Sequence, residues 1–508
     1  MSPWSGRVEA ALNASPTWAQ RLLLPTLAAG VFLGGLDQTV VVTALPSMIR
    51  ELEVPFNRLD QAAWIVTSYL IGYTVALPLV GRVADRYGHL LVYVICLAWF
   101  AITSVACGLA PSLEWLVAAR ALQALGGGAV LPVALGLLGS RASAMAQIGR
   151  FGLLLGLAEA GGVVGPLYGA MVLNWLDWRW IFYLNVPIVV VLVALLALAR
   201  QAGAARVVSR ASGRIDYVGA VLAAIGLGLL ALALSGEAFS TALSLQQILM
   251  LLAAALVLGG FAIWQMRTPD PLLDLRLLRS ASFAAANLSN FFIGAALIVA
   301  MVDVPLWLAT VRQGSGVEGG LLLLRMTALI PPGAWIGGLL ARRLGVAAVG
   351  VIGSLVAALG LWLTSAWGID VGIGQQTLDL AITGFGFGLV IAPVTATAVD
   401  QAGRERAATA AAWITVLRVV GMLVALSFLT HYGLGLFHEL TSSLALPLPQ
   451  AGDDASTSAA RLAAYQQAIQ SATLAVFRSV FLGAAVCCVA AAICCALLQR
   501  GRTVRLSE

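Results

Sequence analysis

The sequence contains no lysine and few charged residues of either sign. Its 29 basic residues are all arginine, and charged residues make up only 10% of the 508 positions. A soluble protein of this length needs roughly a quarter charged residues to cover its surface, so a soluble globular protein is excluded. Without lysine the chain also lacks the P-loop pattern G-x-x-x-x-G-K-[ST], which argues against ATP hydrolysis by this chain.

Histidine and cysteine are also scarce. The three histidines, His89, His431 and His438, accompany no recognisable acid or nucleophile motif, so we expect no enzyme and no catalytic residue. The six cysteines all lie inside apolar runs, where they act as small hydrophobic residues; a soft-metal site at the adjacent pairs 487/488 and 494/495 is the weaker alternative. We therefore predict no metal and no cofactor. The arginines form no dense block, so we expect no nucleic-acid partner.

What the sequence does contain is apolar runs long enough to cross a membrane. Hydrophobic residues make up 60% of the chain, and a spanning helix needs about 20 apolar residues. Ten-residue alternating segments are absent, which excludes an outer-membrane barrel. The sequence therefore predicts an all-α integral membrane protein with fourteen transmembrane helices. The runs cover about 22–49, 61–80, 88–109, 113–138, 147–173, 180–199, 215–235, 245–266, 283–309, 320–341, 346–366, 377–399, 407–431 and 472–498.

The arginines between the runs predict the orientation in the membrane. With an even number of spans, twenty arginines fall in the connections and tails on one side and five on the other. Cytoplasmic loops carry the excess of basic residues. We expect both termini in the cytoplasm.

An internal repeat divides the chain into two halves. Gly81 to Gly88, after the second span, reads GRVADRYG, and Gly338 to Gly345, after the tenth, reads GLLARRLG. Repeats of this kind are typical of transporters. The predicted domains are a cytoplasmic N-terminus (1–21), a six-helix bundle (22–199), connectors with two extra spans (200–282), a second six-helix bundle (283–498) with an outer extension (431–471), and a cytoplasmic tail (499–508).

Several segments, taken in order, resemble the major facilitator superfamily, specifically its fourteen-span drug:proton antiporter branch. They are Leu36-Asp-Gln-Thr-Val40 with Ala44-Leu-Pro46, the loop Gly81 to Gly88, Arg120 with Gln123 and Gly126 to Gly128, Gly161 to Gly169 with Gly165-Pro166, and Trp178 to Pro187. The resemblance covers roughly residues 20 to 500. Two departures are His89, where members usually place a basic residue, and Glu159, which interrupts a glycine run.

The resemblance implies a proton-coupled exporter of hydrophobic or amphipathic compounds, of the multidrug-efflux type, in the plasma membrane of a prokaryote. Its transport cycle would be alternating access driven by the proton gradient. The alternative is an exporter of lipids that works with a periplasmic or extracellular partner protein, because lipid-exporting relatives carry similar outer extensions. In both cases the expected partners are the hydrophobic or amphipathic substrate and the surrounding membrane lipid.

Charged residues within spans are costly in lipid and are candidates for function. Depths estimated at about 1.5 Å per residue put Asp37 and Arg120 in the outer half of the first bundle, where we predict that they interact. Asp303 and Arg325 also match in depth, and a structural ion pair is our first interpretation, with a transport role as the alternative. Arg418 lies near mid-membrane, at the cavity or the seam between halves.

Glu159 lies about 13 Å into the fifth span. Glycines and apolar residues surround it in sequence. Loss of water favours the protonated carboxyl, so Glu159 could carry a proton. The alternative is a neutral acid hydrogen-bonded to backbone.

The loop motifs predict a gate at the cytoplasmic end. By the family resemblance, Asp85 would latch the two halves in the outward-open state, with Arg404 or Arg406 as partners; a solvated turn residue is the alternative. The gate residues we predict are Gly81, Asp85, Arg86, Gly88, Arg342 and Arg343. In the fifth span Gly161, Gly165 and Gly169 recur every fourth residue beside Pro166, which predicts close helix packing and a hinge that closes this gate.

The connection from 431 to 471 is longer than the other outer connections. It holds Pro447-Leu-Pro449 and an acidic turn at Asp453-Asp454, and residues 459–477 read as one helix that continues into the last span. The last helix is therefore expected to project beyond the membrane. A docking platform or lipid guide is the functional interpretation, and a tolerated loop insertion is the alternative.

Overall fold

The computed structural model describes residues 17–54, 59–139, 144–201, 215–234, 244–402, 407–444 and 455–498. These ranges form helices and no strands. The tails 1–16 and 499–508, the residues Arg404 and Arg406, and the extension tip with Pro447 to Pro449 and Asp453-Asp454 lie outside the described residues.

The first half of the chain forms one helical bundle. Its helices are α2 (Thr17–Glu51), α3 (Leu59–Ala62), α4 (Trp64–Tyr87), α5 (His89–Gly108), α6 (Leu113–Gly139), α7 (Ala144–Trp175), α8 (Arg179–Tyr183) and α9 (Asn185–Gln201).

The second half repeats this plan. Its helices are α12 (Ala281–Val311), α13 (Gly316–Thr327), α14 (Ile330–Leu344), α15 (Val346–Ser365), α16 (Ile373–Ala402), α17 (Ala407–Thr441) and α18 (Ala455–Ala496). Between the halves lie α10 (Tyr217–Leu234), α11 (Leu245–Arg267) and the short 3₁₀ helix η2 (Leu275–Arg279).

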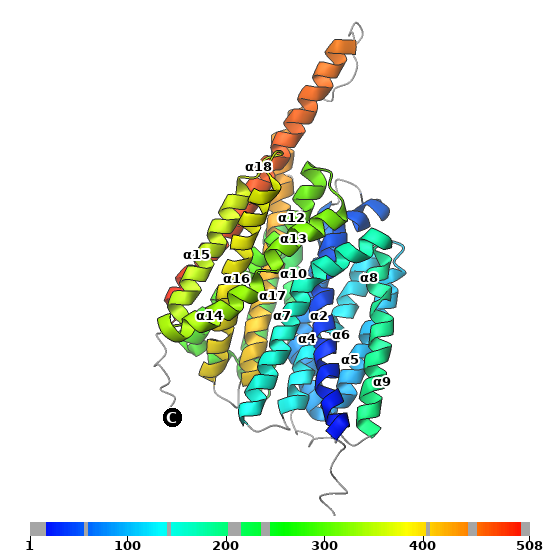
Figure 1. Cartoon of the computed structure of the whole chain (residues 1–508). Helices are drawn as coiled ribbons and strands as arrows, with labels where there is room; N and C mark the ends of the chain where they lie inside the picture. The colour runs from blue at the N-terminus through cyan, green and yellow to red at the C-terminus, as the bar shows by residue number, and fades with distance from the viewer. Residues whose placement is uncertain are drawn as a thin grey trace, which may run out of the picture.

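Fourteen segments of the described chain are long and apolar enough to cross a membrane, as the sequence predicts. The tenth differs in detail from the expected single helix over 320–341. It consists of α13 and α14, which are strongly tilted relative to the neighbouring helices (Figure 1). The helix breaks at Ala328 and Leu329, just before Pro331-Pro332. The two prolines lack the N–H groups that would donate to the preceding turn, so the hydrogen-bond ladder is interrupted here.

The two halves share their internal packing. In the first, α7 packs along α2, and in the second, α17 packs along α12. In each half, the second residue after the end of the first helix is a non-glycine residue with positive φ. It is Glu53 (48°) after α2 and Gln313 (53°) after α12. The repeat seen in the sequence is therefore a repeat of structure.

Two ends of the molecule can be told apart. We call the end with the turns at Gly88 and Gly345 the motif end, and the opposite end, from which α18 projects, the extension end (Figure 1). The 42 residues of α18 correspond to a length of about 63 Å, roughly twice the hydrocarbon core of a bilayer. The prediction of one helix continuing into the last span is confirmed.

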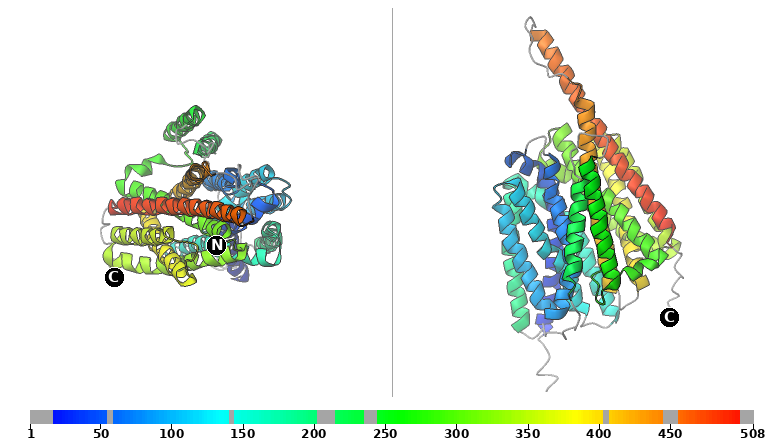
Figure 2. Two further views of the ribbon diagram at one scale, coloured as in Figure 1. Left: turned by 90° about the horizontal axis from the view of Figure 1, so that it is seen from above. Right: turned by 180° about the vertical axis from the view of Figure 1, so that it is seen from behind.

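Helices α10 and α11 stand as a pair on one side of the bundle (Figure 2). They pack against each other, and α10 also packs against α4 of the first half and α17 of the second. The inserted spans therefore lie over one of the seams between the halves.

Candidate transport site and gates

A fully buried ion pair lies inside the first half. Nη1 of Arg120, on α6, donates to Oδ2 of Asp37, on α2, over 2.8 Å, and both side chains have 0% exposure. The contact that we expected from equal depth is present. Burying two charges is unfavourable unless each is paired and its remaining hydrogen-bonding groups are satisfied.

Neighbouring side chains supply those further hydrogen bonds. Oδ1 of Asp37 accepts from the amides of Gln123 at 3.3 Å and Asn185 at 3.2 Å. Arg120 Nη1 also donates to Gln123 Oε1 at 2.6 Å, and Ser104 Oγ accepts from Gln123 at 2.7 Å. Helices α2, α6 and α9 thus meet at one carboxylate, and α5 joins the network through Ser104, which accepts from Gln123 and Asn185. Gln123 and Asn185 stood in the family motifs, but sequence alone did not assign them to Asp37.

Aromatic rings close the ion pair off. The guanidinium carbon of Arg120 lies 4.0 Å from the centre of the Tyr69 ring and 5.7 Å from that of Phe182. Both rings are essentially unexposed. Cation–π contact stabilises the charge of arginine in a dry site. Asp37 therefore lies within the first bundle, shielded from solvent.

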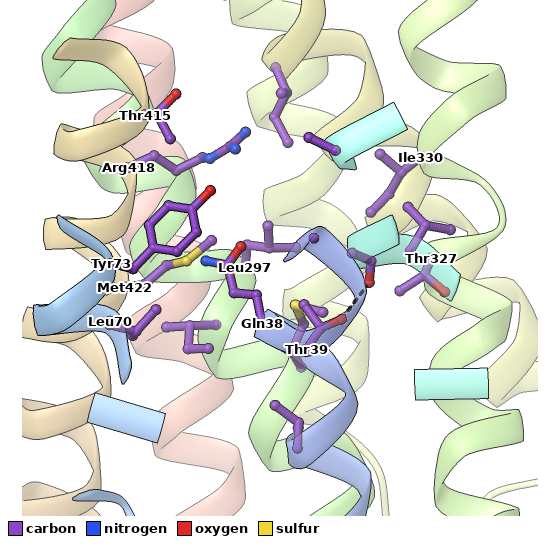
Figure 3. Close-up of a pocket in the computed structure, with 18 of the residues that line it drawn as sticks. Gln38, Thr39, Leu70, Tyr73, Leu297, Thr327, Ile330, Thr415, Arg418 and Met422 are labelled. Atoms are coloured by element: carbon purple, nitrogen blue, oxygen red, sulfur yellow. Dashed lines mark hydrogen bonds between the residues drawn. The ribbon is translucent and has the colours of Figure 1, made fainter. Parts of the chain in front are cut away.

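A cavity lies between the two halves, next to this pair. Its wall includes Gln38 and Thr39, the residues that follow Asp37, and Tyr73, Thr415 and Arg418 (Figure 3). Most of the remaining wall is apolar, with Leu70, Leu297, Met301, Ile330, Ile391 and Met422 among its residues. The volume is about 70 Å³, room for a few water molecules. In this conformation the cavity is too small to enclose a lipid.

The structure places the other predicted site residues unevenly around this cavity. Arg418 lines it, as one of the two positions we considered for it. Glu159 lies on α7 between Ala158 and Gly162, which both line the cavity. The side chain of Glu159 is outside the described part of the structure, so its role as a proton carrier stays a prediction.

Asp303 and Arg325 do not form the ion pair that we expected. The described part of the structure has no basic group within 4.0 Å of the Asp303 carboxylate, and Nη1 of Arg325 is buried without a hydrogen-bond partner. The reason is the register of the helices: Gly319 of α13 crosses α12 at Pro305. Arg325 lies six residues along α13 from that crossing, a rise of about 9 Å, whereas Asp303 lies two residues along α12 from it, a rise of about 3 Å. The two side chains are therefore at different distances from the crossing and do not meet.

A further buried acid was missed by the sequence reading. Asp379, on α16, is 2% exposed, and its Oδ2 accepts from the indole N–H of Trp367 at 2.9 Å. The rings of Trp367 and Trp307 lie 5.0 Å apart. Asp379 stands two residues inside the predicted twelfth span but was not among the candidate residues named from the sequence. The nearby Trp367 was the signal that could have placed it.

The gate motif is folded on itself at the motif end. Nε2 of His89, the first residue of α5, lies 3.1 Å from Oδ1 of Asp85, one turn earlier. Arg86, Arg342 and Arg343 are exposed, and Gly81 has room for a side chain. Among described residues Asp85 is ion-paired only with His89. The predicted latch to the second half is therefore not formed here between the residues that the structure describes.

The glycine face of α7 packs directly on α2. A Cβ added to Gly165 or Gly169 would lie 2.8 Å from a carbonyl oxygen of α2, that of Leu36 or Val40 respectively, and Gly161 likewise faces the backbone of α2 at Phe32. The hydroxyl of Thr39 donates to Gly162 O at 2.9 Å. These contacts give the tight packing predicted from the spacing; a hinge at Pro166 stays a prediction.

The halves meet closely at the extension end. Gly320 of α13 faces the outer part of α7, where a Cβ would lie 2.8 Å from the carbonyl oxygen of Pro166 and would overlap Ala170. This contact closes the passage between α7 and α13 on that side. In this conformation the halves are in contact at the extension end, and Asp85 has no ion pair with the second half among the described residues.

Two similar helical halves with a cavity between them and a close contact at one end define the architecture of a membrane transporter. The family model of the major facilitator superfamily matches residues 27–426. The chain belongs to the major facilitator superfamily.

Its relatives include proteins named as triacylglyceride transporters. One from Mycolicibacterium smegmatis is 35% identical over 480 residues, 91% of this chain and 84% of its own. One from Mycobacterium tuberculosis is 32% identical over 513 residues, 96% of each chain.

Solved structures agree with the fold. A peptide transporter of the POT family matches with TM-score 0.63 and 19% identity, covering 95% of this chain and 97% of its own. A bacterial homologue of the lysosomal transporter Spinster, in an inward-facing conformation, matches with TM-score 0.60 and 15% identity over 94% and 98%. At such identities the likeness concerns the fold.

Proposed function

We propose that this protein exports a neutral lipid of the triacylglyceride class by alternating access, and that a proton gradient drives the cycle. The observation that carries the substrate class is full-length similarity, at 32% identity over 96% of both chains, to a protein named as a triacylglyceride transporter. This favours the lipid alternative over the drug-efflux interpretation that we put first from the sequence.

The wall of the central cavity supports a lipophilic substrate. Leucine, isoleucine, methionine and valine side chains make up most of it, and the few polar groups are Gln38, Tyr73, Arg418 and threonines. An ester carbonyl accepts hydrogen bonds from such donors, while acyl chains need apolar walls. Sugars would need a denser set of polar groups.

Asp37 supports proton coupling. Its carboxylate is buried beside the cavity and paired with Arg120, and Gln38 and Thr39 connect it to the cavity wall. Protonation would weaken the ion pair and loosen the junction of four helices. One proton moved inward supplies about 2.3 kcal/mol per 100 mV, and about 1.4 kcal/mol more per unit of pH gradient, enough to move a solute uphill.

The arginine distribution and α18 support an outward direction of transport. The arginine excess favours a cytoplasmic position for the motif end and both termini, and α18 would then project outside the cell. We propose that the extension 431–471 receives lipid or a periplasmic or extracellular partner protein there. A helix that leaves the bilayer could carry an apolar substrate away from the membrane surface.

Reconstitution tests this proposal. Purified protein in proteoliposomes is offered a labelled triacylglyceride and a panel of lipophilic drugs, with and without an imposed proton gradient, and Asp37→Asn is the control. We expect gradient-dependent movement of the triacylglyceride that a protonophore abolishes. Movement of drugs only would favour drug efflux, and movement that persists after the gradient is collapsed would overturn proton coupling.

A further inference from the structure

The segment that joins α11 to α12, residues 268–280, is hydrogen-bonded to both halves of the bundle. Nη2 of Arg82, near the motif end of α4, donates to the carbonyl oxygen of Pro271 over 3.0 Å. The indole N–H of Trp413, near the motif end of α17, donates to the carbonyl oxygen of Asp274 over 3.2 Å. Since α4 and α17 belong to different halves, this connector bridges the seam between them.

Apolar contacts reinforce the bridge. Leu272 and Leu273 of the connector are each 6% exposed. Leu272 packs with Val75 of α4 and Ala220 of α10, and Leu273 is part of the large core shared by both halves. Burying two leucines stabilises the bridge, so the connector is held by more than its two hydrogen bonds.

A third attachment ties the connector to the inserted helix pair. The carboxylate of Asp216, at the start of α10, accepts from Trp264 Nε1 and Gln265 Nε2 of α11, each at 2.7 Å. Gln265 Oε1 in turn accepts from the backbone N–H of Leu273 at 3.2 Å. Hydrogen bonds to a buried carboxylate are strong and directional, so α10, α11 and the connector behave as one unit.

The position of this unit gives it a mechanical consequence. Figure 2 shows α10 and α11 lying over the seam of α4 and α17, where α10 packs on both helices. Rocking of the halves requires relative movement along the seams. A segment bonded to both halves at the motif end resists separation on its own side.

We propose that residues 268–280 are a strap that limits how far the motif ends of α4 and α17 move apart during transport. The hinge line of the movement then lies on the side of the inserted helices. The strap rests on alternating access as proposed above, but it does not depend on the substrate or the driving ion.

Distance measurements between spin labels test the strap. The six native cysteines are replaced by alanine, and spin labels are attached to cysteines introduced by Tyr87→Cys and Leu344→Cys. Tyr87 and Leu344 are 54% and 55% exposed and lie beside the equivalent turns of the two halves. The two hydrogen bonds of the strap to the halves are released by Arg82→Gln with Trp413→Phe, while its buried leucines stay in place. We expect a longer mean distance and a broader distribution than in the labelled parent.

The matched control is Arg276→Gln with Trp335→Phe. Arg276 is exposed on the connector itself and Trp335 is 69% exposed on α14, so this pair should leave the distances unchanged. Unchanged distances in the released variant, or equal shifts in the control, would overturn the strap. If the double variant does not purify as a folded protein, the two single variants are judged by the same criterion. A longer distance in the released variant, together with no triacylglyceride movement by the parent protein, would support the strap and reject triacylglyceride as the substrate.

Discussion

Gly88 and Gly345 hold the same left-handed backbone conformation at equivalent turns of the two halves, with φ of 99° and 85°. Each joins two consecutive helices through a single residue, α4 to α5 and α14 to α15. With ψ of 127° and 154°, both residues lie in an extended region with positive φ that strains any residue with a Cβ. The repeated glycine of the gate motif therefore has a structural cause apart from any latch.

Replacement of Gly345 by alanine should destabilise the protein by about 1–3 kcal/mol, because no neighbour lies within 4 Å and only the backbone conformation opposes the new Cβ. Gly338→Ala is the control: it lies within α14, also has open space around it, and should stabilise the helix by about 0.5–1 kcal/mol. Thermal unfolding in detergent distinguishes the two. Equal effects would show that the turn tolerates a side chain.

Asp37→Asn should abolish transport while leaving expression intact, because it removes the only carboxylate bonded to Arg120 in the described structure. The unpaired arginine should cost about 3–5 kcal/mol in the free energy of unfolding. Adding Arg120→Gln should recover much of that stability without restoring transport. Proton-driven lipid movement by Asp37→Asn in proteoliposomes would refute the coupling role.

Gly165→Val should disrupt the contact of α7 with α2, since even its Cβ meets the carbonyl oxygen of Leu36 at 2.8 Å. We expect a large fall in the yield of folded protein, or a loss of at least about 1–3 kcal/mol from overpacking. Gly156→Val on the same helix has no neighbour within 4 Å of its Cβ and serves as the control. Equal yields of the two variants by fluorescence-detected size exclusion would contradict this.

A double-mutant cycle should find no energetic coupling between Asp303 and Arg325. Residues without direct contact usually contribute additively, within about 0.5 kcal/mol. The free energies of unfolding of Asp303→Asn, Arg325→Gln and the double variant would be compared in mixed micelles. A coupling energy well above that limit would restore the ion pair predicted from the sequence.

Deletion of residues 440–462 should reduce lipid export and leave the bundle folded. The deleted segment consists of the last two residues of α17, the connection between the helices and the first eight residues of α18. Thermal unfolding is expected to match the parent, whereas labelled triacylglyceride reaching an acceptor falls. Unchanged export would favour a tolerated insertion, and a lower unfolding temperature would indicate a structural role.

The apolar runs, the repeated loop motif and the family motifs were enough to predict the fourteen spans and the family. A spanning helix must satisfy its own backbone in lipid, so local composition dictates it. The contact of Asp37 with Arg120 also followed, because a membrane orders residues by depth and few charges are available at each level. The long helix into the last span was a local pattern as well.

Only the tertiary structure decided how the helices are set against each other. Asp303 misses Arg325 because Gly319 crosses α12 at Pro305, and a sequence carries no direct measure of such a crossing. The break at Ala328 and Leu329, the partner of Asp379 and the bridge from Arg82 to Pro271 depend likewise on contacts between distant segments. Hydrophobicity acts on each helix by itself, whereas register is set by side chains that meet only after the helices have packed.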